Sequence, residues 1–208
     1  MSETTVGSQE SFMNQPFETA IFDNGSIDSR VDPQTELFRA LRSHPRTVPP
    51  RWLYDDRGSE LYSQITRLPE YYQTEAERSI LEANAATIAE ITSATTVIEL
   101  GSGTSDKTRT LLDAFVAHGS INRFAPLDVS ETTLIEAAAM LGRRYPDLEV
   151  APVVGDFNRH LHRLPSGGTR LVAFLGGTIG NFYQEERRAF LGVLSDVLEP
   201  GDWLLLGV

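Results

Sequence analysis

The sequence contains no cysteine, which excludes a disulfide framework, a thiolate metal site and a cysteine nucleophile. This absence is typical of a reducing compartment, and we expect the protein to be cytoplasmic. No apolar run approaches the ~20 residues that a membrane span requires, and we expect no signal peptide at the start of the chain. An internal repeat is absent as well.

Positive charge is scarce. The 208 residues include 18 Lys and Arg but 29 Asp and Glu, which gives a net charge of −11. Such a charge repels phosphate backbones and anionic membranes. We therefore expect a small-molecule substrate, and neither a nucleic acid nor a membrane as a partner. The length and the 40% hydrophobic content fit one globular domain, which we expect to be a monomer.

Composition divides the chain into three parts. Residues 1–30 are rich in Ser, Thr, Glu and Asn and predict a disordered tail, with a short strand or a segment folded onto the body as the alternative. Residues 31–93 are predicted to form a helical and aromatic segment that contributes to a substrate pocket. Residues 94–208 are predicted to form the sheet domain.

Aromatic residues concentrate in the second part. Tyr54 and Tyr71 fall on or near loops, where they can line a pocket for a small planar or cationic ligand. The alternative is that these aromatics only cover one end of the sheet. Thr74 and Glu77 have the spacing of a capping box, which predicts the start of the next helix.

Strands and helices alternate from Thr95 onward. The predicted strands are 97–100, 124–129, 150–154, 171–176 and 203–208, and the predicted helices are 106–117, 131–144 and 184–198, with a shorter helical or irregular piece near 158–163. Such alternation indicates an α/β fold with a doubly wound, mostly parallel sheet. Ligands of these sheets bind beyond the carboxyl ends of the strands.

The segment 95–108, TTVIELGSGTSDKT, is predicted to be a buried strand, a glycine loop and the start of a helix. Gly101 and Gly103 permit a tight turn and a close approach of a ligand to the backbone. Glu99 is an acid in a buried strand, so we interpret it as a ligand-side group. A dinucleotide loop would need glycine where Asp106 stands, and the glycine spacing does not fit a Walker loop. The remaining pattern, E-x-G-x-G-x-S, resembles the first motif of Rossmann-like S-adenosylmethionine-dependent methyltransferases, with a structural glycine turn as the alternative.

Acidic residues end the next two predicted strands. Asp128 lies 27 residues after Gly101, where a carboxylate can accept hydrogen bonds from both hydroxyls of a ribose. Its alternative role, the N-cap of the following helix, is already available to Ser130. Asp156 and Phe157 can bind an adenine amino group and cover the ring, with a simple turn as the alternative.

The fourth predicted strand ends in LGGTIGN, residues 175–181. Two glycines and Asn181 suit a backbone that passes close to reacting atoms. The Asn/Asp-Pro-Pro-aromatic run, which is usual at this strand end in methyltransferases that act on base amines, is absent. A small-molecule acceptor is therefore the better interpretation.

Taken together, six stretches resemble the family of histidine Nα-methyltransferases of the ergothioneine pathway. They are RWLYDDRGSELYSQITRLPEYYQTEAE, ELGSGTSDKTRTLLDAF, PLDVS, GDF, FLGGTIGN and EPGDWLLLG, and the resemblance runs from Leu37 to Gly207. It implies a Rossmann-like methyltransferase that transfers three methyl groups from S-adenosylmethionine to the α-amine of histidine, giving hercynine. Relatives with the same core methylate other amino-acid amines.

The resemblance also implies residue roles. The cofactor S-adenosylmethionine is expected to contact Glu99, Gly101, Ser102, Gly103, Lys107, Asp128, Asp156 and Phe157. The substrate is expected to contact Tyr54, Tyr62, Tyr71, Gly176, Thr178 and Asn181. Tyr54 and Asn181 are the catalytic candidates, because a hydroxyl and an amide can orient the lone pair of the attacking amine. Tyr54 and Tyr71 are the candidates for a cation–π contact with the methylated ammonium. No metal is expected, and His160 and His162 are predicted to be solvated.

The Rossmann-like methyltransferase core has seven strands, and members of the family continue beyond the position of Val208. We therefore expect a fragment that lacks the C-terminal strands and leaves its last strand at a sheet edge. Such a fragment would bind the cofactor weakly and turn over poorly. The alternatives are a methyltransferase of another amino acid or small amine, and a non-catalytic cofactor-binding module.

Overall fold

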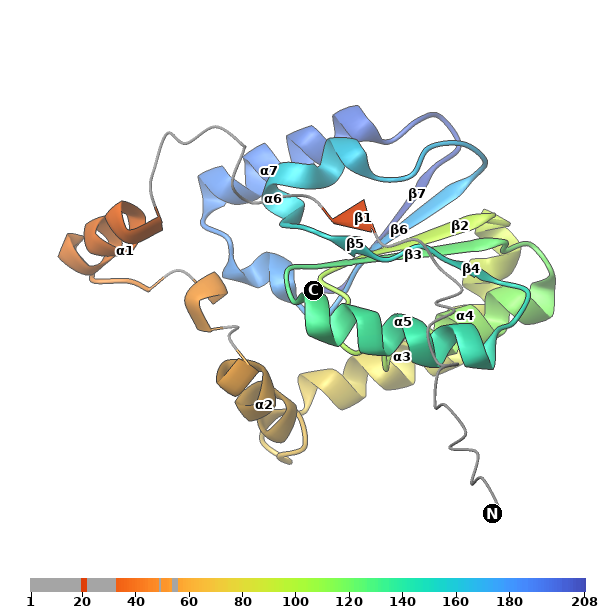
Figure 1. Ribbon diagram of the computed structural model, residues 1–208, viewed down its shortest axis with the longest axis horizontal. Helices are drawn as coiled ribbons and strands as arrows, with labels where there is room; N and C mark the ends of the chain where they lie inside the picture. The colour runs from red at the N-terminus through yellow and green to blue at the C-terminus, as the bar shows by residue number, and fades with distance from the viewer. Residues whose placement is uncertain (1–19, 22–32, 49, 54–55) are drawn as a thin grey trace, which may run out of the picture.

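The computed structural model describes residues 20–21, 33–48, 50–53 and 56–208. Within them, one sheet is covered by helices on both faces, and a short helical segment projects from one side (Figure 1). The helices and strands are β1 Ala20–Ile21, α1 Pro33–Arg42, η1 Pro50–Leu53, α2 Asp56–Ile65, α3 Gln73–Thr92, β2 Thr96–Leu100, α4 Thr108–His118, β3 Arg123–Asp128, α5 Glu131–Arg144, β4 Glu149–Val150, β5 Val153–Val154, α6 Phe157–His160, η2 Leu161–Arg163, β6 Arg170–Phe174, η3 Thr178–Asn181, α7 Gln184–Val197 and β7 Trp203–Leu206.

The described strands form a parallel sheet in the order β1-β5-β3-β2-β6-β7, and β4 also pairs with β3. β2 lies in the middle, with Val97 opposite Phe124 of β3 and Leu171 of β6. β7 pairs with β6 and is the edge strand of the order, as expected. The predicted doubly wound parallel α/β sheet is confirmed.

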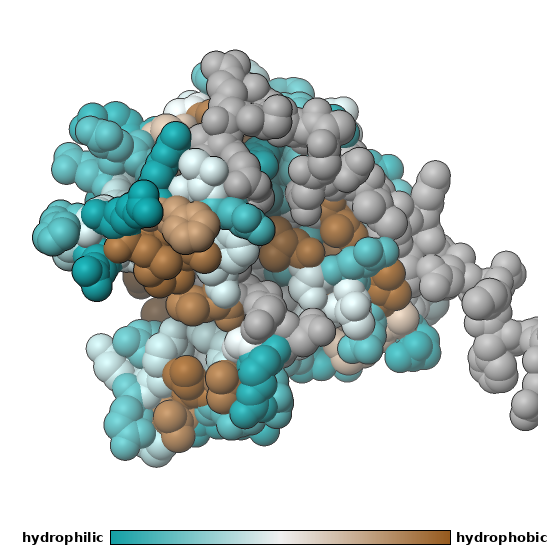
Figure 2. Space-filling view, turned by 60° about the vertical axis from the view of Figure 1, so that its left-hand side comes forward, coloured by the Kyte–Doolittle hydropathy of each residue, from teal (hydrophilic) through white to brown (hydrophobic). Residues whose placement is uncertain are grey.

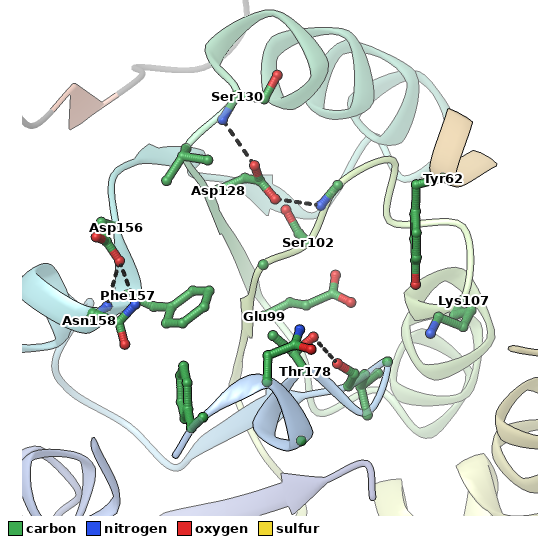
Figure 3. Close-up of a pocket in the computed structure, with 18 of the residues that line it drawn as sticks. Tyr62, Glu99, Ser102, Lys107, Asp128, Ser130, Asp156, Phe157, Asn158 and Thr178 are labelled. Carbon is green, nitrogen blue, oxygen red and sulfur yellow. Dashed lines mark hydrogen bonds between the residues drawn. The ribbon is translucent and has the colours of Figure 1, made fainter. Parts of the chain in front are cut away.

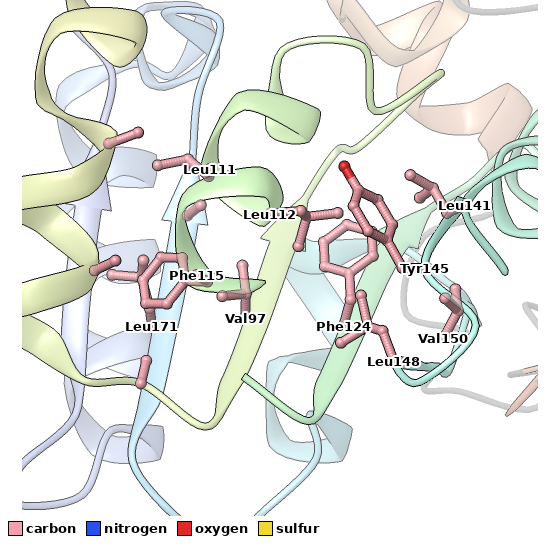
Figure 4. Close-up of a cluster of buried hydrophobic side chains, with 14 of the residues drawn as sticks. Val97, Leu111, Leu112, Phe115, Phe124, Leu141, Tyr145, Leu148, Val150 and Leu171 are labelled. Carbon is pink, nitrogen blue, oxygen red and sulfur yellow. The ribbon is translucent and has the colours of Figure 1, made fainter. Parts of the chain in front are cut away.

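Two apolar layers enclose the sheet. On one face, α3, α4 and α5 pack on Val97, Phe124 and Leu171 (Figure 4). On the other face, η2 and α7 pack on Ile98, Leu127 and other strand residues. All five residues of β2 are buried, which is why this strand is apolar on both faces except at Thr96 and Glu99. The carboxyl end of β2 is therefore held between two packed layers.

The strand predicted for 150–154 is two short strands, β4 and β5. Pro152 lies between them, and Pro126 lies in the neighbouring stretch of β3. Neither proline has a backbone N–H, so the ladder is interrupted at this level.

Two other elements differ from the prediction. Ala20–Ile21, within the predicted tail, form β1 and pair with Val153 and Val154 of β5. η3 follows β6 as a single 3-10 turn that the hydrophobic pattern did not predict, because it contains only one buried apolar residue, Ile179.

The segment from α1 to α2 projects from the sheet (Figure 1). Several of its apolar side chains face solvent, including Phe38, Leu41, Leu53, Leu61 and Ile65. The face in Figure 2 accordingly shows apolar patches between polar side chains. α3, in contrast, packs against α4 through Leu81, Ala85 and Ala89. None of the helices that the structure describes has the length and apolarity needed to cross a membrane.

Candidate active site

A cavity of about 1220 Å³ opens at the carboxyl ends of the strands. Its walls come from the loops after β2, β3, β5 and β6, with further residues from α2, α3 and α7 (Figure 3). Most of the predicted site residues line it: Tyr62, Glu99, Gly101, Ser102, Gly103, Lys107, Asp128, Asp156, Phe157, Gly176, Thr178 and Asn181. The cavity therefore lies where ligands of doubly wound sheets bind.

The glycine loop is tied to the neighbouring strand. The N–H groups of Gly101 and Ser102 both donate to the carbonyl of Leu127, over 2.8 and 3.1 Å. Gly101 has a φ of +70° and Gly103 a φ of +49°, values that L side chains rarely adopt. This geometry favours glycine at both positions and keeps the loop next to the end of β3.

Asp128 joins this loop to the start of α5. Its Oδ2 accepts a hydrogen bond from Gly103 N–H and its Oδ1 accepts one from Ser130 N–H, each over 2.9 Å. The Ser130 hydroxyl donates to Thr133 Oγ1 and does not cap the helix backbone. The prediction that the Ser130 side chain caps α5 is thus wrong, and the Asp128 carboxylate accepts the hydrogen bond from Ser130 N–H at the start of this helix. A carboxylate has about four acceptor sites, so Asp128 retains capacity for a ligand in the cavity (Figure 3).

Glu99 is the most perturbed acid of the site. Burial raises the pKa of Glu99 to about 8, although the nearby Thr108 hydroxyl and Lys107 ammonium lower it. The negative charges of Asp128 and Glu77 raise it further. Its Oε2 has no hydrogen-bond partner among the described residues, and the carboxyl group points into the cavity (Figure 3). Glu99 is therefore largely neutral at pH 7. Its unpartnered oxygen can form a hydrogen bond with a polar group in the cavity.

Asp156 and Phe157 line the cavity from the turn between β5 and α6. Asp156 caps α6, because its Oδ1 accepts from Asn158 N–H over 2.8 Å and from Asn158 Nδ2 over 3.0 Å. The alternative interpretation, a turn after the strand, therefore describes part of the role of Asp156. The Phe157 ring packs on Phe174, with 5.3 Å between ring centroids, and still lines the cavity. It forms an apolar wall against which a flat ring can lie.

His160 is fully buried, so the prediction that it is solvated is wrong. Its Nδ1 accepts a hydrogen bond from Asp156 N–H over 2.9 Å, and a side chain at Gly155 would collide with its ring. His162 is exposed. His160 therefore fixes the turn after β5. Among the described residues, no group of three or more His, Asp or Glu could hold a metal ion.

The turn after β6 carries three of the predicted substrate residues. Gly176 has a φ of +76°, Thr178 Oγ1 donates to the Leu175 carbonyl over 3.0 Å, and the exposed Asn181 lines the cavity. The structure thus places these three residues at the cavity that the glycine loop also lines.

The three predicted tyrosines differ in where the structure places them. Tyr62 lines the cavity, and its hydroxyl points toward Lys107 (Figure 3). Tyr71 does not line it in the structure described here; its ring stands edge-on to Tyr62, with 6.2 Å between centroids. Tyr54 lies outside the described residues.

Glu77 does not have the helix-capping role that its spacing from Thr74 predicts. The predicted capping box is not formed, because α3 begins at Gln73 and its N-cap Tyr72 makes no side-chain cap bond. Glu77 Oε1 accepts from Gly176 N–H over 2.7 Å, and Oε2 forms an ion pair with Lys107. No local pattern reports these partners, since they lie 99 and 30 residues away in the chain. Arg67 and Arg78 also line the cavity and were not predicted.

A family model described as "Histidine-specific methyltransferase, SAM-dependent" matches residues 33–208. The chain belongs to this family. The match covers the glycine loop, the acidic strand ends and the turn after β6, and it confirms the resemblance found in the motifs.

Individual relatives agree. This methyltransferase chain is 50% identical over 172 residues to the histidine N-alpha-methyltransferase of Mycobacterium tuberculosis, a match that covers 83% of this chain and 54% of that protein. It is 34% identical to the ergothioneine biosynthesis protein 1 of Neurospora crassa, over 84% of this chain and 20% of that protein. The chain thus spans about half the length of its mycobacterial relative.

Solved structures show the same fold. The mitomycin 7-O-methyltransferase MmcR matches 82% of this chain and 48% of its own, with a TM-score of 0.51 and 18% identity. At this identity the likeness concerns the fold alone, and it confirms the Rossmann-like methyltransferase sheet.

Proposed function

We propose that this chain carries the S-adenosylmethionine site of an N-methyltransferase that transfers three methyl groups to the α-amine of L-histidine, in ergothioneine biosynthesis. The observation that carries the proposal is the cavity at the strand ends, where Glu99, Asp128 and Lys107 converge in a chain of the histidine-specific family. The names of the mycobacterial and fungal relatives support the substrate and the pathway.

The residues of the cavity fit the proposed cofactor. Its ribose needs acceptors for two hydroxyls, and Asp128 retains free lone pairs that face the cavity. Its adenine needs an apolar wall, which Phe157 provides. Its carboxylate needs a cation, for which Lys107 is available.

Unpartnered polar atoms in the same wall also fit a polar ligand. Glu99 Oε2 and the hydroxyls of Ser102 and Ser105 are buried and have no hydrogen-bond partner among the described residues. Buried polar groups are normally satisfied, so their grouping around the cavity indicates that a ligand or water completes them. The Asp128 carboxylate also complements the positive charge of a sulfonium ligand, and the neutral Glu99 carboxyl can donate or accept a hydrogen bond beside it.

S-adenosylmethionine supplies an electrophilic methyl group on a positively charged sulfur. The contribution of this chain is to place the amine in line with that methyl group, which is the main source of rate for such a displacement. Asn181 and Thr178, on the turn after β6, present polar side chains to the cavity. The Asn181 amide oxygen can accept a hydrogen bond from the neutral amine and so orient its lone pair. Water accepts the proton that the ammonium form of the substrate loses before each attack.

The test is calorimetric titration with S-adenosylmethionine, followed by mass spectrometry after incubation with histidine. We expect binding of the cofactor, and we expect Asp128→Ala to lower its affinity by about 100-fold, because two charge-assisted hydrogen bonds are lost. Asp113→Ala is the control, since Asp113 is a surface acid on α4 that pairs with Arg144. An unchanged affinity in Asp128→Ala would contradict the proposed site.

The mass spectra decide the substrate. Methylated histidine would support the proposal, and methylation of another amine but not of histidine would contradict the proposed acceptor. Binding of the cofactor without any methylated product would favour the alternative of a non-catalytic module.

A further inference from the structure

One carboxylate connects four elements beside the cavity. Glu77 projects from α3 to Lys107, which precedes α4, and to Gly176, which follows β6. Gly207, which follows β7, packs against the same carboxylate, because a Cβ at this position would lie 2.2 Å from Glu77 Oε1. The side chain of Glu77 is only 16% exposed. Both of its oxygens are therefore committed to the cavity wall rather than to solvent.

The surroundings of Glu77 leave little freedom. Gly176 has a φ of +76°, and a Cβ there would lie 3.5 Å from Lys107 Nζ. The ammonium thus sits over the Gly176 peptide while both contact Glu77. Because Gly207 lacks a side chain, the carboxylate has room to reach both partners at once.

Lys107 is the only lysine of the sequence, whose other basic residues are histidines and arginines. It lines the cavity, and its charge acts on Glu99. An ammonium has three N–H donors on a flexible side chain. A contact with one ligand atom therefore does not fix the position of the nitrogen, and a second protein contact is needed to hold it in place. The ion pair with Glu77 supplies that restraint from behind the cavity wall.

We propose that Glu77 is a positioning residue, which holds the Lys107 ammonium and the Gly176 peptide at a fixed separation so that Lys107 can bind the carboxylate of the cofactor. This inference rests on the proposed function. Glu77 does not line the cavity. It acts through Lys107 on the cofactor and through Gly176 on the turn that carries Thr178 and Asn181.

The contact itself is tested without a ligand. Acetylation by an amine-specific reagent, followed by mass spectrometry, reports Lys107 alone, with the α-amine of Met1 as the internal reference. The reagent must reach the nitrogen, and the ion pair with Glu77 holds that nitrogen in a wall where the Lys107 side chain is only 20% exposed. We expect Glu77→Gln to raise the acetylation rate of Lys107 several-fold. The matched control is Glu82→Gln, an exposed acid of the same helix, which we expect to leave the rate unchanged.

Amide hydrogen exchange of Gly176 separates the two contacts of Glu77. We expect Glu77→Gln to retain slow exchange, because the amide oxygen of Gln still accepts from Gly176 N–H. Glu77→Ala removes both partners, so we expect faster exchange at Gly176 as well as faster acetylation of Lys107. Equal acetylation rates in the unchanged chain and in Glu77→Gln would overturn the proposal.

Two ligands test the consequence for binding. S-adenosylhomocysteine carries the amino-acid carboxylate, whereas 5′-methylthioadenosine lacks the whole amino-acid end. We expect Glu77→Gln to weaken S-adenosylhomocysteine by about tenfold, the value of one charge-assisted contact, and 5′-methylthioadenosine by less than about twofold. A merely structural role of Glu77 would weaken both ligands alike, and that outcome would overturn the proposal.

A second variant guards against loss of folding in Glu77→Gln. Glu77→Asp keeps the charge but is one methylene shorter, so it cannot hold both partners, and we expect an intermediate loss of S-adenosylhomocysteine affinity. If neither ligand binds the unchanged chain, the proposed function fails. If both ligands bind but Glu77→Gln does not discriminate between them, only the role of Glu77 fails.

Discussion

The sheet body and the projecting segment from α1 to α2 differ in what covers their apolar residues. All five residues of β2 are buried, whereas Phe38 and Leu41 of α1 are 60% and 41% exposed. Both regions have the amphipathic patterns and helix starts that predict their elements, so local pattern does not distinguish them. Burial depends on a partner surface, which the sheet supplies to α3, α4 and α5 and which α1 lacks among the described residues.

The same difference divides the candidate site. The glycine loop and Asp128 are held by backbone hydrogen bonds to Leu127, Gly103 and Ser130. The projecting segment contributes residues such as Tyr62 from α2, a helix whose Leu61 and Ile65 side chains are exposed. We therefore expect changes in the body to alter stability strongly and changes in the projecting segment to alter it little.

The largest effect is expected at Asp202, beside the edge strand. Burial alone would raise the pKa of Asp202, but hydrogen bonds from Arg170 and from the backbone N–H groups of Glu199 and Arg170 lower it below its usual value. The side chains of Arg170 and Asp202 are 3% and 2% exposed. Asp202→Asn leaves the Arg170 guanidinium without its buried counter-charge, because its other partner, Glu199 at 3.8 Å, is 66% exposed. We therefore expect a loss of about 3–5 kcal/mol in the free energy of unfolding.

Denaturant unfolding measures this loss. The control is Glu149→Gln, which breaks an ion pair between Arg123 and Glu149 whose side chains are 35% and 57% exposed. We expect the control to cost less than about 1 kcal/mol, because exposed pairs are screened by water. Similar losses in both variants would contradict the distinction between the buried and the exposed pair.

The next effect is a pH dependence at Glu99. Because its folded pKa is raised to about 8 from 4.5, the unfolded chain binds fewer protons than the folded chain between these pH values. This group alone therefore makes stability fall as the pH rises through that window. Glu99→Gln removes this dependence, and we expect its stability relative to the unchanged chain to improve by roughly 2–4 kcal/mol between pH 5 and pH 8.

Urea unfolding at several pH values checks this prediction, with the difference between the two chains plotted so that the other acids cancel. A difference that does not change with pH would show that Glu99 ionises normally in the folded chain.

A smaller effect is expected at Asp156, whose carboxylate caps α6. Asp156→Ala removes the acceptor for Asn158 N–H and should lower the melting stability by about 1 kcal/mol. Asp156→Asn keeps an acceptor oxygen in place, so we expect it to retain most of the stability. Equal losses in the two variants would indicate that the charge, rather than the cap, matters.

The smallest effect is expected in the projecting segment. Phe38→Ala should change the free energy of unfolding by less than about 0.5 kcal/mol, because the ring is largely in solvent already. The same substitution at Phe115, which is fully buried between α4 and the sheet, should cost about 3–5 kcal/mol. A large loss at Phe38 in thermal or denaturant unfolding would show that α1 is covered in solution.

Sequence patterns predicted the parts of the fold that local physics decides. The buried run before Gly101 and the acids that end β3 and β5 located the cavity, because parallel strands bring their carboxyl ends together. The patterns did not predict the break between β4 and β5, which depends on Pro126 and Pro152 lying at the same level of adjacent strands.

Long-range partners also escaped prediction. Glu77 has the spacing of a helix cap, yet it contacts Lys107 and Gly176 because α3 packs beside α4. The sequence predicts His160 in solvent because it falls on an expected loop or helix start, but its ring packs onto the turn after β5. Such contacts are set by tertiary packing, which a local window does not contain.

The two peptide groups that hold Asp128 have a consequence for selectivity. Hydrogen bonds from the N–H groups of Gly103 and Ser130 hold the Asp128 carboxylate in place, so a ribose bound as we propose would meet a fixed acceptor and cause little rearrangement. A fixed carboxylate can accept hydrogen bonds from two adjacent hydroxyls and gains no substitute contact when one of them is missing. We therefore expect the proposed site to discriminate between ribonucleosides and their 2′-deoxy counterparts.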